Sequence, residues 1–306
     1  MGLVRIEASS LRGSEVGTTS RYCQLLEEGN ILFFPETPVE IPHNDIEFLL
    51  ALKQAGSTYH KNIAYRPRQH RVTGLATGVR GDADRVLQIM SRFSEGTIKF
   101  LTTLLPPYAG SWRVDYASFR PQEERGRKLR VEARNDLLHV DAFPTRPTNG
   151  DRILRFFTNV NPGKARRWVT GQAFEDLVTH QTGPTRMPLP SVRRSLLRRA
   201  GRRVGRLARA ARLPVVVRSS YDEFMLGFHH YLKRNQDFQK NSPKSQWEFP
   251  SHSSWMVFTD LVPHAALSGQ FALEQTLIVS RAAAVLPGRA PVDVLERLCG
   301  TRLTDD

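Results

Sequence analysis

The feature that most constrains the fold is a change of hydrophobic pattern at Pro106 and Pro107. Before the two prolines, from about residue 82 to 105, apolar residues recur at three- and four-residue spacing, which predicts an amphipathic helix that the prolines end. After them, from about residue 112 to 168, short runs rich in β-branched and aromatic residues alternate with Pro, Gly and Asn, as is typical of strands. We therefore expect an α+β fold with early helices and a β-rich body.

Other segments follow the same two patterns. Residues 29–36 are a compact apolar run ended by Pro35, which predicts a buried strand, whereas the residues before it show little periodicity. Asn44 and Glu47 match a capping box, so we expect a helix to begin there and to end at Gly56. The remaining predictions are a helix from Asp222 to about Tyr231, strands within 254–264 and 269–280, and a terminal helix with Pro291 early and Gly300 just past its end.

The composition excludes several classes of protein. Of 306 residues, 40% are hydrophobic and 24% are charged, which argues against disordered, collagen-like and membrane-spanning chains. Only two cysteines are present, Cys23 and Cys299, which excludes a disulfide framework and a cysteine-based zinc finger. No run reaches the roughly 20 apolar residues of a membrane-spanning helix, and the start lacks a secretory signal, so we expect a cytoplasmic location.

Most of the formal net charge of +14 lies in one segment. Residues 186–218 contain eleven arginines and no acid, which leaves the rest of the chain at +3. Between residues 191 and 213 the arginines fall on one side of a helical projection and apolar residues on the other, as in a basic amphipathic helix at an anionic membrane surface. The predicted membrane-binding residues are Arg198, Arg199, Arg202, Arg203, Arg206 and Arg209.

Two other interpretations of this segment are open. It can be a solvated insertion, because Gly201 and Gly205 weaken a helix. It can also bind nucleic acid through its arginines, although no aromatic residues are interleaved with them and no recognisable nucleic-acid-binding module is present. We favour the membrane surface over nucleic acid as its partner.

The main chemical candidate is the pair His139 and Asp141 in the run LLHVDAF, which predicts a strand. Alternate residues of a strand point to the same face, so the imidazole and the carboxylate can converge on one cation. His264, at the end of an apolar run, is a candidate third ligand. Two histidines and one carboxylate are the ligand set of non-haem Fe(II) oxygenases. Zinc hydrolases use a similar set, but the helical His-Glu-x-x-His signature is absent. The competing interpretation is a surface histidine beside a solvated aspartate, with His264 at a strand end.

Longer blocks surround these residues: LLEEGNILFFPE (25–36), YHKNIAYRP (59–67), LLHVDAFPTRPTNGDRILRFFTNVNP (137–162) and WMVFTDLVPHAAL (255–267). Together they resemble the Kdo 3-hydroxylase family of Fe(II)/2-oxoglutarate dioxygenases. The resemblance implies a double-stranded β-helix (jelly roll) flanked by N-terminal helices, and Fe(II) held by His139, Asp141 and His264, with 2-oxoglutarate and O2 as cosubstrates. It also implies hydroxylation at carbon 3 of Kdo in Kdo-lipid A during lipopolysaccharide synthesis.

The same resemblance suggests how the chain is organised. We expect residues 1–306 to form one dioxygenase domain. Within it, residues 1–110 are an α/β support, residues 111–175 and 235–285 are the jelly-roll core, and residues 186–218 are a basic helical insertion.

The distal carboxylate of 2-oxoglutarate requires a cation, preferably an arginine that makes two parallel hydrogen bonds. Many members of the superfamily place it shortly after the distal histidine, but residues 268–280 contain no basic residue here. Arg155, on the strand that follows His139 and Asp141, is the expected anchor. Arg120 is a second candidate cation, and Trp168 a candidate wall of the pocket; the competing interpretation of Arg155 is an exposed strand residue.

An acidic sugar substrate calls for further cations near the iron. Lys61 and Arg66, in the block that also contains His60 and Tyr65, are candidate substrate contacts, and Arg146 is another. A solvated polar loop is the competing interpretation for each.

The leading hypothesis is a cytoplasmic dioxygenase, peripheral on the inner membrane, that hydroxylates Kdo in lipid A precursors. One alternative is a dioxygenase of the same fold acting on another substrate, such as a protein side chain. Another is a non-catalytic β-barrel module whose arginine-rich helix binds nucleic acid. The sequence makes no prediction of the oligomeric state.

Overall fold

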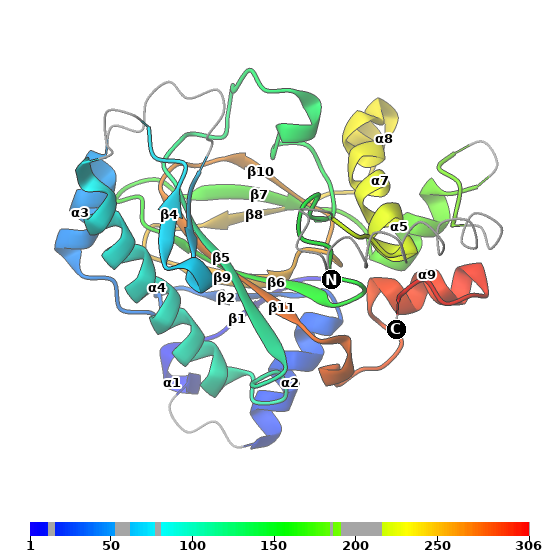
Figure 1. Ribbon diagram of the computed structural model, residues 1–306, viewed down its shortest axis with the longest axis horizontal. Coiled ribbons are helices and arrows are strands. Elements are labelled where there is room, and N and C mark those ends of the chain that lie inside the picture. Colours follow the sequence, from blue (N-terminus) through cyan, green and yellow to red (C-terminus); the bar gives the residue numbers. More distant parts are fainter. Residues whose placement is uncertain (12–15, 53–61, 77–80, 184–185, 191–215, 306) are drawn as a thin grey trace.

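The computed structural model describes residues 1–306 except 12–15, 53–61, 77–80, 184–185, 191–215 and 306 (Figure 1). Gly56, Lys61 and the proposed membrane-binding arginines therefore lie outside the described residues. No helix in the described part combines the length and the apolar character needed to cross a bilayer.

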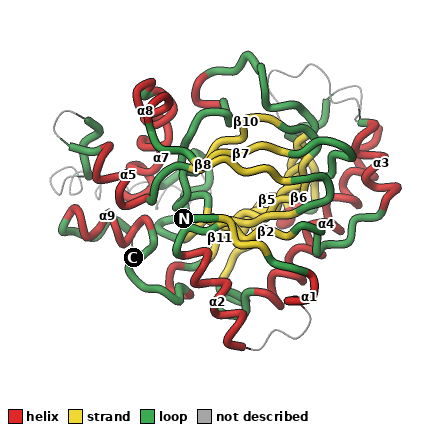
Figure 2. Tube along the Cα trace, turned by 180° about the vertical axis from the view of Figure 1, so that it is seen from behind, coloured by secondary structure: helices red, strands yellow, loops and turns green. Residues whose placement is uncertain are grey.

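The described strands form two sheets. An eight-stranded sheet has the order β1-β2-β9-β6-β11-β5-β3-β4, in which β1 and β2 are parallel and the other neighbours antiparallel. A three-stranded antiparallel sheet has the order β10-β7-β8, and Figure 2 shows it lying over the large sheet. The strands are β1 (Leu3–Arg5), β2 (Ile31–Phe34), β3 (Ile63–Arg66), β4 (Arg71–Thr73), β5 (Trp112–Arg120), β6 (Arg152–Asn159), β7 (Arg166–Thr170), β8 (Ser245–Phe249), β9 (Ser254–Phe258), β10 (His264–Ser268) and β11 (Ala272–Val279).

Helices cover the outside of this sandwich. In Figure 1, α3 and α4 lie together beside one edge of the sheets, and α5, α7, α8 and α9 lie beside the opposite edge. The helices are α1 (Ala8–Leu11), α2 (Val16–Glu27), α3 (His43–Ala51), α4 (Ala83–Leu104), α5 (Phe174–Gln181), α7 (Ser220–Arg234), α8 (Gln236–Asn241) and α9 (Pro291–Cys299). The α+β prediction is confirmed.

Several predicted elements are found close to their expected bounds. The helix before the double proline is α4, which buries Val86, Met90, Phe93, Thr97 and Leu101 along one side, and the strand predicted at 29–36 is β2. β5, β6 and β11 fall within their predicted runs. α9 ends at Cys299 and is followed by Gly300, whose left-handed φ of 63° fits a helix C-terminus.

Other local predictions were wrong. α3 begins at His43 after Pro42, with no side-chain cap, so Asn44 lies inside the first turn rather than capping it. A helix, α2, occupies much of the region that shows little periodicity in the sequence. α7 begins earlier than predicted, because Ser219 and Asp222 form a capping box at its start.

A buried aromatic cluster joins the two sheets. Phe157 and Trp255 come from the large sheet, and Trp168 and Phe249 from the small one. The rings of Phe249 and Trp255 are stacked with centroids 4.0 Å apart, and Trp168 meets Phe157 edge-on at 4.9 Å. Each such pair contributes about 0.5–1.5 kcal/mol beyond the area that it buries. The cluster therefore fixes the small sheet over the large one next to the candidate site.

Candidate active site

The segment that carries His139 and Asp141 is not a regular strand, which corrects the sequence prediction. Only His139 forms a β-bridge, which is antiparallel and pairs it with His264. The His139 N–H donates to the His264 carbonyl (3.1 Å), and the His264 N–H donates to the His139 carbonyl (2.8 Å). The Asp141 N–H donates to the Thr259 carbonyl, and the Gln239 side chain bonds both backbone groups of Leu138. The segment therefore contacts β10 through a single bridge at His264, and its other backbone groups find partners outside a regular ladder.

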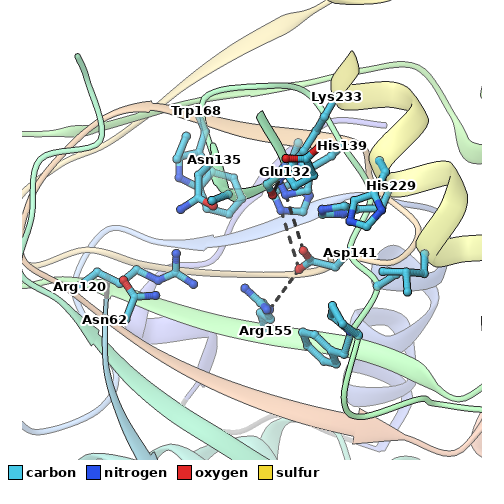
Figure 3. A pocket seen from close by; sticks show the side chains of 18 of the residues that line it. Asn62, Arg120, Glu132, Asn135, His139, Asp141, Arg155, Trp168, His229 and Lys233 are labelled. Carbon is cyan, nitrogen blue, oxygen red and sulfur yellow. Dashed lines mark hydrogen bonds and ion pairs between the residues drawn. The ribbon is translucent and has the colours of Figure 1, made fainter. Parts of the chain in front are cut away.

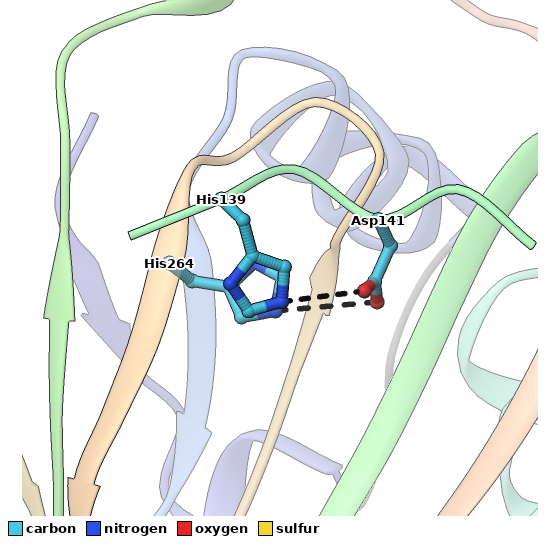
Figure 4. Close-up of side chains that lie close together, drawn as sticks. All are labelled: His139, Asp141 and His264. Carbon is cyan, nitrogen blue, oxygen red and sulfur yellow. Dashed lines mark ion pairs between the residues drawn. The ribbon is translucent and has the colours of Figure 1, made fainter. Parts of the chain in front are cut away.

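This backbone arrangement brings the three predicted metal ligands together (Figure 4). His139 Nε2 lies 3.7 Å from Asp141 Oδ1, and His264 Nε2 lies 4.0 Å from Asp141 Oδ2. One ligand atom from each of the three residues falls within 4.8 Å of the others, and all three side chains are buried. Alternation along the segment places His139 and Asp141 on one side, as the spacing predicted, and the bridge to His264 adds the third ligand.

The donor set fits a divalent transition metal. Nδ1 of His139 donates to the Leu137 carbonyl (2.6 Å), and Nδ1 of His264 donates to the Val262 carbonyl (2.9 Å), so both Nε2 atoms carry a lone pair toward Asp141. Asp141 Oδ2 is buried and accepts no hydrogen bond among the described residues. Two imidazoles and one carboxylate on one side of a site are typical of non-haem iron centres.

The charges of these groups also suit metal binding. Burial, and then the charge of Lys233, hold the pKa of His139 well below its usual range, and burial lowers the pKa of His264. Burial raises the pKa of Asp141, but the charge of Arg155, a hydrogen bond with His139 and the charges of the two histidines together hold that pKa well below its usual range. At neutral pH the site therefore offers neutral imidazoles and an ionised carboxylate, the forms that bind a metal.

A pocket of about 460 Å³ opens onto the three ligands (Figure 3). Trp168 lines it and stacks on the His264 ring, with centroids 5.2 Å apart and an angle of 18°. Arg155 and Arg120 also line it, from β6 and β5. Arg155 Nε lies 3.2 Å from Asp141 Oδ2, and its side chain is 13% exposed. The three residues predicted to bind 2-oxoglutarate thus line the pocket that contains the candidate metal ligands.

Glu274, on β11 between the two arginine-bearing strands, was missed by the sequence analysis. Its carboxylate lies 2.8 Å from Arg120 Nη2 and 3.6 Å from Arg155 Nε, and accepts hydrogen bonds from Ser118 and Thr276. Register explains this contact, because Glu274 pairs with Ser118 on β5, and Thr276 pairs with Arg155 on β6. The sequence did contain a signal for this residue, because an acidic side chain inside the largely apolar strand ALEQTLIV requires a buried partner.

Comparison with known proteins places the chain in a family. The family model for 3-deoxy-D-manno-oct-2-ulosonic acid (Kdo) hydroxylase matches residues 13–302. The chain belongs to the Kdo hydroxylase family. The resemblance seen in the sequence blocks is thereby confirmed. None of the curated proteins matches the chain.

Solved structures of a Kdo hydroxylase, KdoO, are similar to the chain over almost its whole length. KdoO is a non-heme Fe(II) alphaketoglutarate dependent dioxygenase whose sequence is 34% identical to this chain. Its complex with alphaketoglutarate and Fe(III) matches with a TM-score of 0.81, and the match covers 99% of this chain and 98% of KdoO. The cobalt(II) complex has a TM-score of 0.82 and the apo structure 0.81, at the same identity and coverage. The fold of this Kdo hydroxylase family member therefore has solved counterparts.

Two predicted substrate contacts of this Kdo hydroxylase family member line a neighbouring pocket rather than the one at the metal ligands. Arg66 and Arg146 line a pocket of about 190 Å³. Arg146 lies between the rings of Tyr116 (4.0 Å) and Phe143 (4.3 Å), and its guanidinium is 2.8 Å from Asp115. Phe143 also lines the larger pocket, so the two pockets adjoin through its ring.

Helix α7 contributes pocket residues that the sequence analysis also missed. His229 Nδ1 donates to the Val140 carbonyl at 2.7 Å, and its ring meets His139 edge-on with centroids 4.9 Å apart. Lys233, one turn further along the same side of the helix, lines the pocket as well. The i, i+4 spacing of His229 and Lys233 indicates that they lie on the same side of the helix. It does not show which surface of the protein that side covers.

Proposed function

We propose that this chain catalyses the Fe(II)- and 2-oxoglutarate-dependent hydroxylation of carbon 3 of Kdo in Kdo-lipid A. Membership of the Kdo hydroxylase family supports the substrate class. The observation that carries the chemistry is the buried set His139, Asp141 and His264, with both imidazoles fixed as Nε2 donors beside an ionised carboxylate. We also infer that the two facing sheets are the double-stranded β-helix of the superfamily.

The residues of the pocket divide the work. His139, Asp141 and His264 would hold the metal. We propose that Arg155 receives the distal carboxylate of 2-oxoglutarate, that Arg120 is a second cation for it, and that Trp168 shields one side. When bound, iron and 2-oxoglutarate supply the oxidation of a C–H bond by dioxygen, with succinate and CO2 as products. The protein positions the sugar and keeps water away from the reacting groups.

We place the rest of the substrate in the neighbouring pocket. Arg66 and Arg146 line it, and the Arg66 guanidinium lies 5.1 Å from the Tyr116 ring centroid. Because arginine binds carboxylates and phosphates through paired hydrogen bonds, this pocket suits an acidic group of the lipid-linked substrate beyond the hydroxylated sugar.

The proposal is tested with purified protein, Fe(II), ascorbate and 2-oxoglutarate. Adding Kdo-lipid A should start succinate release, and mass spectrometry should find one added oxygen atom on the Kdo residue. Absence of turnover with Kdo-lipid A would reject the proposed function.

Replacing Arg155 by Lys should raise the KM for 2-oxoglutarate about 10–100-fold, because a charge-assisted hydrogen bond of about 1.5–3 kcal/mol is lost with the planar fork. Arg120→Lys should raise this KM as well. Arg167→Lys is the matched control, since Arg167 on β7 forms an ion pair with Glu248 at the surface and lies outside the pocket. An unchanged KM in both pocket variants would exclude these arginines as the anchor.

We further propose that the segment 186–218 binds the anionic surface of the inner membrane. Its charge supports this, since each arginine close to such a surface contributes about 1 kcal/mol. Replacing residues 191–213 by a Gly-Ser linker should abolish flotation with vesicles that contain anionic lipid, while succinate release from a water-soluble Kdo substrate is retained. Flotation that persists without these residues would refute the proposed membrane role.

A further inference from the structure

Lys233 is a buried cation beside the candidate metal site. It lies in the last turn of α7, is 5% exposed and lines the pocket together with His139 (Figure 3). Its charge is close enough to lower the pKa of both His139 and His264. Lysine side chains are rarely buried unless an anion or another polar partner binds the ammonium group.

Within the described part of the chain, Lys233 has no acid of its own. Nζ donates one hydrogen bond, to the Glu132 carbonyl at 2.9 Å, and forms no ion pair. The four acids whose charges act most strongly on it each have an arginine partner. These pairs are Asp141 with Arg155, Asp136 with Arg134, Glu132 with Arg234 and Glu124 with Arg166.

The arginines of the pocket differ from Lys233 in this respect. Arg120 is paired with Glu274, and Arg155 lies against both Asp141 and Glu274. Burial lowers the pKa of Lys233 to about 8, which still leaves most of it protonated at neutral pH. The pocket therefore contains an ammonium group whose charge is not balanced by a dedicated carboxylate, and an entering anion would balance it.

We infer that Lys233 binds the carboxylate of the substrate sugar. Through this contact the enzyme selects an acidic sugar. This rests on the proposed function. A 3-deoxy-2-ulosonic acid carries its carboxylate on C1, so that only C2 separates the carboxyl carbon from C3. When C3 faces the metal, the carboxylate must lie close to the metal as well. Lys233 lies beside His139 and is placed to meet it.

Substrates of two kinds test this assignment: a Kdo glycoside with a free carboxylate and the same glycoside as its methyl ester. The unmodified enzyme should have a KM about 10–100-fold lower for the acid, the value expected for one charge-assisted hydrogen bond. Lys233→Met should lose this preference by raising the KM for the acid while leaving the KM for the ester unchanged. Lys233→Arg should restore part of the preference.

Lys240→Met is the matched control, because Lys240 is exposed at the end of the adjacent helix α8. It should keep the full preference for the acid. The KM for 2-oxoglutarate should be unchanged in every Lys233 variant, which separates loss of the sugar contact from damage to the site.

Two outcomes would overturn the assignment. One is equal KM values for acid and ester in the unmodified enzyme, a result that requires no folded variant. The other is a full preference for the acid in Lys233→Met. Absence of turnover by the unmodified enzyme on either glycoside and on Kdo-lipid A would instead reject the proposed function itself.

Discussion

Replacing His139 by Ala should lower succinate release from 2-oxoglutarate by more than about a hundredfold and weaken metal binding to at least the same extent. Removing a residue that only orients a metal ligand costs about 10–100-fold, so the loss of a ligand must cost more. His139 contributes one of two Nε2 donors in a buried site, and its Nδ1 is already committed to the Leu137 carbonyl. Equilibrium dialysis with Fe(II) or Co(II), together with a succinate assay, measures both effects.

The exposed residue His43 provides the matched control. Its side chain is 85% exposed on α3 and lies 3.3 Å from Glu47. His43→Ala should therefore leave turnover and metal binding at their normal values. If His139→Ala keeps turnover within about tenfold of the unmodified enzyme, the three residues are not the metal site.

Replacing Glu274 by Ala should destabilise the protein by about 3–5 kcal/mol, because two buried arginines then lose their shared counter-ion. For a chain of this size we expect the melting temperature to fall by about 10 °C. The KM for 2-oxoglutarate should rise as well, since Glu274 fixes the directions of Arg120 and Arg155. Thermal unfolding and initial-rate kinetics measure the two effects.

A surface pair provides the control. Glu248 on β8 lies 2.8 Å from Arg167, but both side chains are more than half exposed, so Glu248→Ala should cost no more than about 1 kcal/mol. Similar melting temperatures for the two variants would contradict the proposed role of Glu274.

The cost of losing Glu274 should also depend on pH. Burial raises its pKa, but the charges of Arg155 and Arg120 outweigh that effect and lower it to about 2 from an ordinary value of 4.5. A depressed pKa stabilises the folded state above the unfolded value and loses this effect as the pH falls through the folded value. The difference in unfolding free energy between the unmodified protein and Glu274→Gln should thus be complete above about pH 4.5 and shrink toward pH 2.

The sequence predicted elements whose signal is local. α4 is recognisable because one side of it repeats every three to four residues until the double proline, and β5, β6 and β11 because their runs are apolar and bounded by turn residues. Patterns of this kind depend on the helix and strand periods alone. The same reasoning wrongly predicted a regular strand around His139. The backbone of this segment instead bonds a side chain of α8 and the backbone at Thr259 and His264, which no local pattern shows.

The sequence by itself also determined the family and the three candidate ligands, because the His-x-Asp spacing and the blocks around it are continuous stretches of chain. Only the tertiary structure decided how the charges of the pocket are balanced. Glu274 meets Arg120 across 154 positions of the sequence, and Lys233 meets the pocket because α7 is attached to the backbone at Val140. The energy of a buried charge depends on the groups that surround it in space, and strand order and helix placement bring those groups from distant parts of the chain.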